Sequence, residues 1–290
     1  MSDLKIAVYC IISIGLFTMC SQDNSNVVNV QPTPINDNQS EESQTWRHQS
    51  SGTEVELRSV YFINSQSGWA TGREGTILHT TDGGETWRLQ ESNVQAKIES
   101  VFFTDSQKGW IVNSPQGMIF HTTNGGQNWQ QLSSGVETGL YDLYFIDSQV
   151  GWAVGHGSEE PSGTILRTTN GGQTWVQQPS GTDVGLYGIQ FIDKQIGWAV
   201  GGGGKGTILY TTDGGSTWEQ QSSGTDSGLE DLHFLDEQTG WTVGRDGTIL
   251  HTTDGGQTWE QQTSGITKNL RAVHFINSPE GVRGWAVGNG

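Results

Sequence analysis

The chain has 290 residues, including 42 glycines and 12 tryptophans. Apolar residues make up 32% of it, and with glycine added the share reaches that of an ordinary globular protein, so we expect a folded core. The formal net charge of −17 disfavours binding to nucleic acid and to anionic lipid surfaces. Both cysteines, Cys10 and Cys20, precede residue 21, which excludes a disulfide, a thiol nucleophile and a Cys-ligated metal from the rest of the chain.

Residues 1–20 predict an export signal. Lys5 precedes an apolar run, Ile6 to Met19, whose 14 residues suit a signal peptide and are shorter than the roughly 20 that a spanning helix needs. The run ends at Cys20 and a polar tract, which resembles a bacterial lipoprotein signal with Cys20 as the lipidated residue. Met19 stands where that pattern has a small residue, so the alternative is a soluble exported protein in which Cys20 has no role.

Residues 21–44 predict a disordered tether. They are rich in Ser, Asn, Gln and Pro and contain no aromatic residue, so they bury too little surface to offset the entropy of ordering. Such a tether suits a folded part, residues 45–290, that stands off a membrane.

The tryptophans reveal an internal repeat. All 12 belong to one of two series, Trp46, Trp87, Trp129, Trp175, Trp218 and Trp259, and Trp69, Trp110, Trp152, Trp198, Trp241 and Trp285. Neighbours in the first series are 41 to 46 residues apart. Each unit contains four short extended segments, such as LRSVYFIN at 57–64, GWAVG at 151–155, GTILHTT at 75–81 and TWRLQ at 86–90. Four strands at this period predict an all-β propeller with four-stranded blades.

The turn between the third and fourth strands carries an Asp or Asn before two glycines. The side chain can accept hydrogen bonds from backbone N–H groups two residues on, and Gly adopts positive φ without steric cost. We therefore expect this position to lock the hairpins, and its members are Asp82, Asn124, Asn170, Asp213 and Asp254. The alternative is a calcium site, against which stand the two neutral Asn copies and the lack of a second acidic ligand in the loop.

These motifs carry a family resemblance. The pattern S/T-x-D-x-G-x-T-W is the Asp-box of neuraminidase-type repeats, and its pairing with GWAVG, GTIL and a following SGT resembles the photosystem II stability and assembly factor family. The resemblance covers residues 45–290 and implies an exported or thylakoid-lumen β-propeller that typically has seven blades. It further implies a non-catalytic protein that binds a membrane-protein partner during photosystem II assembly.

The strand count predicts about six blades, the last one incomplete. TWRHQ at 45–49 is in register as a fourth strand without its first three, and residues 270–290 supply a first and a second strand. One third strand is then absent. The readings left open are a truncated gene product, a longer parent with a seventh blade, and a three-stranded last blade in which the Trp46 strand shifts inward.

Two further residue classes are assigned to structure. The tryptophans lie inside strands, so we expect them in the core and not as a platform for sugars or bases. His79, His121 and His251 share one repeat position on different blades and cannot readily converge on a metal. We expect no metal and no cofactor.

Binding is expected in the loops between fourth and first strands and between second and third strands, on the face opposite the Asp-box hairpins, where the copies differ. Four acids stand eight residues after a first-series Trp, Glu54, Glu137, Asp183 and Asp226. They are predicted to surround the channel mouth and to attract a basic partner segment or a cation, unless they only serve an Asx-type turn. Further candidates on the other loops are Arg73, His156, Glu159, Glu160, Lys205 and Arg245, with the insertion 155–163 as the strongest single candidate for a specific contact.

The sequence favours a monomeric, non-catalytic scaffold in the cell envelope that binds a protein, with no nucleic-acid partner. The photosynthetic family members carry a basic, arginine-containing face, whereas this chain has eight arginines and no dense basic patch, so another envelope client fits as well. The alternatives are a surface glycan-binding or adhesion module and a sialidase-like glycosidase. Hydrolysis needs two carboxylates flanking a sugar, but Glu159 with Glu160 and Glu230 with Asp231 are chain neighbours that point to opposite faces of a strand.

Overall fold

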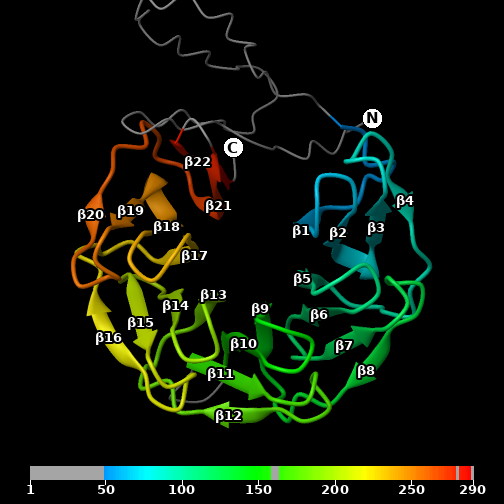
Figure 1. Cartoon of the computed structure of the whole chain (residues 1–290), viewed down its shortest axis with the longest axis horizontal. Coiled ribbons are helices and arrows are strands. Elements are labelled where there is room, and N and C mark those ends of the chain that lie inside the picture. The colour runs from blue at the N-terminus through cyan, green and yellow to red at the C-terminus, as the bar shows by residue number, and fades with distance from the viewer. Residues whose placement is uncertain (1–48, 158–162, 279–280, 289–290) are drawn as a thin grey trace, which may run out of the picture.

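The computed structural model describes residues 49–157, 163–278 and 281–288, which form antiparallel sheets arranged in a ring (Figure 1). The predicted signal at 1–20 with Cys20, the predicted tether at 21–44, and Trp46 all lie outside these residues. Within the described part of the chain, no helix has the length and apolar character needed to cross a bilayer.

Five sheets have four strands each, and in every one the strands follow chain order from the inside of the ring outward (Figure 1). We call them blades 1 to 5. Blade 1 contains β1 (Leu57–Phe62), β2 (Gly68–Gly72), β3 (Ile77–Thr80) and β4 (Arg88–Leu89); blade 2 contains β5 (Ile98–Phe103), β6 (Gly109–Asn113), β7 (Ile119–Thr122) and β8 (Gln130–Leu132); blade 3 contains β9 (Gly139–Phe145), β10 (Gly151–His156), β11 (Gly163–Thr168) and β12 (Val176–Gln178); blade 4 contains β13 (Leu186–Phe191), β14 (Gly197–Gly201), β15 (Thr207–Thr211) and β16 (Glu219–Ser222); blade 5 contains β17 (Leu229–Phe234), β18 (Gly240–Gly244), β19 (Ile249–Thr252) and β20 (Glu260–Gln261). Short 3-10 turns, η1 (Arg73–Gly75) and η2 (Arg245–Gly247), follow β2 and β18.

The sixth sheet has two strands, β21 (Leu270–Ser278) and β22 (Gly281–Gly288). The expectation of about six blades is therefore corrected to five four-stranded blades and a two-stranded sheet, because no third-strand segment follows β22 in the described residues. Seven blades, typical of the resembling family, are not seen in these residues either. The inner strands of successive sheets pack against each other from β1 to β21, but among described residues no comparable packing joins β21 to β1, and Figure 1 shows the ring open there.

Gln49 is the described end of the segment predicted to form an isolated fourth strand. Its Nε2 donates to the carbonyl oxygen of Gly83 at 3.3 Å, and its Oε1 accepts from Trp87 Nε1 at 3.4 Å. Gln221 of blade 4 makes the same two bonds to the next blade, to the Gly255 carbonyl at 3.0 Å and from the Trp259 indole at 3.4 Å. Gln49 therefore occupies, beside blade 1, the place of a fourth-strand glutamine.

Aromatic side chains join neighbouring blades. Trp152 of blade 3 is fully buried and stacks on Phe191 of blade 4, with ring centroids 3.5 Å apart. The edge of Trp218 contacts the same phenyl ring at 5.9 Å. The Trp152 indole also donates to the Gly214 carbonyl at 3.0 Å, in the hairpin of blade 4. Equivalent stacks follow the other second strands, so these tryptophans form the core between blades, as we expected from their placement.

The first glycine of the GWAVG motif allows this packing. A Cβ at Gly151 would lie 2.5 Å from Cδ1 of Phe145 on the adjacent strand. Any larger residue would push the phenyl ring out of its stack with Trp110, whose centroid is 3.8 Å away. The GWAVG motif therefore supplies the tryptophan of each stack and also the glycine that leaves room for the phenylalanine on which the preceding blade's tryptophan stacks.

Candidate functional site

Loops of two kinds meet on one face of the ring. The turn between β2 and β3 bonds to the segments that precede first strands, through Arg73 N to the Glu56 carbonyl at 3.0 Å and Gly75 N to the Ala96 carbonyl at 2.8 Å. The Asp-box hairpin instead contacts the turn between first and second strands, through Gly83 N to the Gln66 carbonyl at 2.8 Å. We call the face that carries the turns between second and third strands and the segments before first strands the mouth face. It carries all the binding residues that the sequence predicted within the described part.

The Asp-box side chains are used inside their own hairpins. Asp82 Oδ1 accepts from the Thr80 hydroxyl at 2.8 Å and from Thr86 N at 2.9 Å, and Oδ2 accepts from the Thr86 hydroxyl at 2.6 Å. The backbone N–H belongs to the residue four positions on, so the sequence expectation of two positions on is wrong. Asn124, Asn170, Asp213 and Asp254 accept the same backbone bond. These bonds lower the pKa of Asp82 and of Asp254 to about 2, the side-chain bond to the threonine contributing most.

The predicted binding residues lie on separate loops of the mouth face. Glu54, Glu137, Asp183 and Asp226 are all exposed, as are Arg73, His156 and Lys205. Arg73 Nε pairs with Glu56 at 2.8 Å, and Arg245 Nε pairs with Glu230 at 3.2 Å. Glu159 and Glu160, in the insertion expected to make a specific contact, lie outside the described residues.

A β-bulge interrupts every first strand at the same place. In β9, for example, Leu140 pairs with Gly155 and Asp142 with Val154, so Tyr141 is an extra residue outside the ladder. A bulge of this kind redirects the side chain of the extra residue. The six extra residues are Arg58, Glu99, Tyr141, Tyr187, Glu230 and Arg271, which we call the bulge ring.

The glycine that ends GWAVG accommodates the bulge. Gly201 pairs with Leu186 at the start of β13, beside the bulged Tyr187. A Cβ at Gly201 would lie 2.8 Å from the Cα of Leu186 and would clash with the Gly185 carbonyl oxygen. Gly72, Gly155, Gly244 and Gly288 make the same close contact, whereas blade 2 has Asn113 at this position and keeps the bulge.

Members of the bulge ring contact one another in pairs. Glu99, whose side chain is 7% exposed, lies 4.0 Å from Arg58 and 2.5 Å from Lys97. Glu230, whose side chain is 8% exposed, binds Arg271 at 2.8 Å and Arg245 at 3.2 Å. These two buried carboxylates are neutralised by their own arginines and lysine.

The remaining pair of the ring is aromatic. Tyr141 and Tyr187 contact edge to face, with ring centroids 5.3 Å apart. Both are half-buried, and burial is the main cause that raises the pKa of Tyr187, so its phenol stays protonated at neutral pH. In order around the mouth face, the bulge ring therefore has a charged pair from blades 1 and 2, the tyrosine pair from blades 3 and 4, and a charged pair from blade 5 and the sixth sheet.

Two aspartates lie on the inner strands directly after the bulges. Asp142 accepts from the Ser100 hydroxyl at 2.8 Å and from Ile189 N at 3.0 Å, so it links blades 2, 3 and 4. Asp231 accepts from Val273 N at 2.8 Å and links blade 5 to β21. Burial raises the pKa of Asp142 to about 6. Burial, followed by the charge of Asp142, raises the pKa of Asp231 to about 8.

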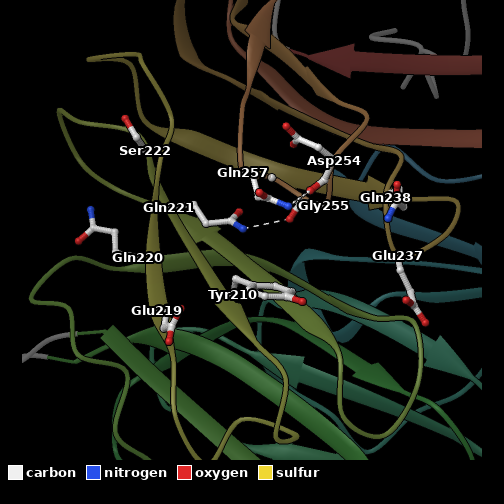
Figure 2. A pocket seen from close by; sticks show the side chains of 11 residues that line it. Tyr210, Glu219, Gln220, Gln221, Ser222, Glu237, Gln238, Asp254, Gly255 and Gln257 are labelled. Atoms are coloured by element: carbon white, nitrogen blue, oxygen red, sulfur yellow. Dashed lines mark hydrogen bonds between the residues drawn. The ribbon is translucent and has the colours of Figure 1, made fainter.

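A cavity of about 490 Å³ lies on the outside of the ring between blades 4 and 5. Figure 2 shows Tyr210, Glu219 and Gln221 on one side of it and Asp254 with Gly255 on the other. Gln221 is bonded to the Gly255 carbonyl and to the Trp259 indole, and Asp254 to Thr252 and Thr258. The polar groups that line the cavity thus already hold the two blades and the hairpin together.

The acidic pair considered for sugar hydrolysis is engaged in structural contacts. Glu230 binds two arginines, and Asp231 accepts backbone N–H groups from Leu232 and Val273. His79, His121 and His251 each stack on the tryptophan of their own second strand. In the described residues no three side chains of the metal-binding types gather into a group.

Sequence reasoning missed the bulge ring and Asp142, and it considered Glu230 and Asp231 only as a catalytic pair. The signal was present in the repeat alignment, because the bulge ring stands 12 residues after each first-series Trp, and Asp142 and Asp231 stand 13 residues after Trp129 and Trp218. Hydrophobic alternation does not reveal a bulge, since the bulged residue breaks the alternation on which strand prediction depends.

Comparison with known proteins gives a family match. The family described as photosynthesis system II assembly factor YCF48 matches residues 38–136, 178–261 and 218–290, well over half of the chain. No curated protein sequence matches.

The chain is also similar to several solved structures. One is YCF48 bound to a D1 peptide (22% identity, 82% of this chain and 95% of that chain, TM-score 0.47). Another is YCF48 from Cyanidioschyzon merolae (19% identity, 80% and 95%, TM-score 0.48). A third is the GH74 enzyme of Niastella koreensis (15% identity, 81% and 44%, TM-score 0.63), a likeness that shows the propeller fold alone.

Proposed function

The chain belongs to the photosynthesis system II assembly factor YCF48 family, and on that premise we propose that it is a non-catalytic β-propeller that binds a protein partner through its mouth face. The observation that carries this proposal is the bulge ring. Six equivalent bulges place six side chains outside the ladder, and these side chains are of three kinds, Arg, Glu and Tyr, while the core positions repeat. Variation at a fixed scaffold position is what a recognition surface requires.

The bonds made by the Asp-box residues of the opposite face, and by the pair Glu230 and Asp231, also favour a binding role for the mouth face. Its Asp-box residues are bonded within their hairpins, as Asp82 is to Thr80 and Thr86. The carboxylates Glu230 and Asp231, the pair that a glycosidase would need, are bonded to arginines and to backbone N–H groups. A binding role therefore fits the described residues better than hydrolysis does.

A site-specific photo-crosslinker tests the face. Benzoylphenylalanine placed at Asp226, exposed on the mouth face, should cross-link a partner in the native envelope. The matched control is the same group at Glu85, which is exposed in an Asp-box hairpin on the other face. Equal adducts from the two positions would contradict the proposed face, and adducts from Glu85 alone would place the partner on the hairpins.

We further propose that the protein is exported and tethered by a lipid on Cys20. The proposal is supported by the apolar run at 6–19 and the polar tract that follows Cys20. In cells fed a radiolabelled fatty acid, the wild-type chain should take up label and Cys20→Ser should not. Label retained by the Cys20→Ser variant would reject the anchor.

A further inference from the structure

We infer that the Tyr141–Tyr187 pair is a docking site for the cationic side chain of an extended basic segment in the partner. The inference rests on the proposed function and names the chemistry that the mouth face recognises. The two rings lie on neighbouring blades, 5.3 Å apart at an interplanar angle of 69°. Both side chains are only half-buried, and the face of a tyrosine ring attracts a cation.

The other four members of the bulge ring are already satisfied by internal ion pairs. An incoming charge at Glu230 would have to displace Arg271 at 2.8 Å and Arg245 at 3.2 Å from a carboxylate that is only 8% exposed. Breaking such a buried pair costs more than a surface contact returns. Glu99 is paired with Lys97 at 2.5 Å, and Arg58 is paired with Glu56 at 2.9 Å. The tyrosine pair is thus the part of the ring that can take a ligand without breaking an existing ion pair.

Carboxylates in the loops beside the pair favour a cation over an anion. Glu137 and Asp183 are exposed in the loops that lead into β9 and β13, four residues before Tyr141 and Tyr187. No ion pair neutralises Glu137 within the described part of the chain. Arg245 and Arg271 are the cations that act on Tyr187, and both are paired with Glu230, at 3.2 and 2.8 Å. With a net charge of −17, the whole chain also draws basic segments toward it.

Peptide binding tests the inference without the natural partner. The probe is an acetylated and amidated nine-residue peptide of alternating Arg and Ser, labelled for fluorescence anisotropy and measured on the full chain at physiological salt. The matched probe replaces each Arg with citrulline, which has nearly the same shape and no charge. We expect the citrulline peptide to bind at least roughly tenfold more weakly, as loss of cation–π and ionic contacts predicts.

Variants then locate the contact. Replacing Tyr141 and Tyr187 with Leu should lower the affinity for the arginine peptide by roughly tenfold. Replacing both with Phe, which keeps the ring face, should change this affinity by about twofold at most. Glu137→Gln with Asp183→Asn should weaken binding by a few fold, and more at low salt because these charges are exposed. Glu85→Gln, on the other face, should have no effect. Circular dichroism checks that each variant is folded.

The inference would be overturned by equal binding of the citrulline peptide, by equal binding to the Leu variant, or by an equal loss of affinity from Glu85→Gln. Binding of neutral oligosaccharides to the tyrosine pair in place of the arginine peptide would also overturn it. If the inference fails while Asp226 still cross-links a partner, the proposed function stands and only the chemistry of the contact is wrong.

Discussion

Replacing Trp152 with Phe tests whether blades are held together by the indole as well as by apolar packing. The change keeps an aromatic ring against Phe191 and removes the bond from Nε1 to the Gly214 carbonyl at 3.0 Å. Among the described residues, no other side chain donates to that oxygen. Leaving a buried carbonyl unsatisfied costs about 1–3 kcal/mol. The smaller ring loses roughly 1 kcal/mol of apolar burial. We expect the free energy of unfolding to fall by about 2–4 kcal/mol.

Urea unfolding followed by far-UV circular dichroism measures this loss, and two other tryptophans act as controls. Trp175 has a buried Nε1 with no hydrogen-bond partner in the described structure, so Trp175→Phe removes no bond and should cost about 1 kcal/mol or less. Trp198→Phe should fall between the two, because the Gly255 carbonyl keeps its bond from Gln221. If Trp152→Phe and Trp175→Phe cost the same, the indole bond does not hold the blades together and the reasoning is wrong.

Three further outcomes follow from the same contacts. Gly151→Ala should lower the free energy of unfolding by about 1–3 kcal/mol through the clash with Phe145, whereas Gly203→Ala, with no atom near the added Cβ, should change it by less than about 0.5 kcal/mol; both are read from urea unfolding. Leu132 occupies the fourth-strand position held by Gln90 and Gln221 in other blades. Leu132→Gln should therefore bond to Gly171 and Trp175 and keep a free energy of unfolding within about 1 kcal/mol of wild type, whereas the shorter Leu132→Asn should be clearly less stable. Equal losses of unfolding free energy in the two variants would refute this. Because the pKa of Asp231 is raised from 3.8 to about 8, the folded chain holds this proton more tightly than the unfolded chain, and stability should fall as pH rises across that window. Asp231→Asn should flatten this decline, measured as Tm at pH values from about 5 to about 8. An unchanged slope would show that Asp231 is not the source of the decline.

The blade pattern was readable from the sequence because each core position recurs. The tryptophan series set the period, and GWAVG with GTIL placed the strands that became β10 and β11. Those segments alternate or are wholly apolar, so strand periodicity identifies them. The assignment of the loops to one face also follows from the order of strands in a blade, and Gly75 bonded to Ala96 shows those loops in contact.

The contacts between neighbouring blades could not be predicted from the sequence in the same way. Gln49 next to Gly83 and Trp87 depends on how one blade sits beside another, which no local pattern encodes. The pairing of Glu230 with Arg245 and Arg271 joins side chains 15 and 41 residues away. Such contacts depend on the register between strands and on the bulge, and only the three-dimensional arrangement fixes both. The tyrosine pair belongs to this class, which is why the candidate site was predicted as loops alone.

On the proposed function, the bulges separate the residues for recognition from the strand ladder that keeps the chain folded. Each bulged residue lies outside the strand ladder, and the residue that pairs just before the bulge is a glycine such as Gly201 in every sheet except blade 2, which has Asn113. Of the six positions, the two tyrosines can change identity without breaking an ion pair, whereas Glu99 and Glu230 can change only together with their cationic partners. A lineage that keeps this scaffold can acquire a new client by altering a handful of codons, and an engineer can choose the same six sites for a binding library.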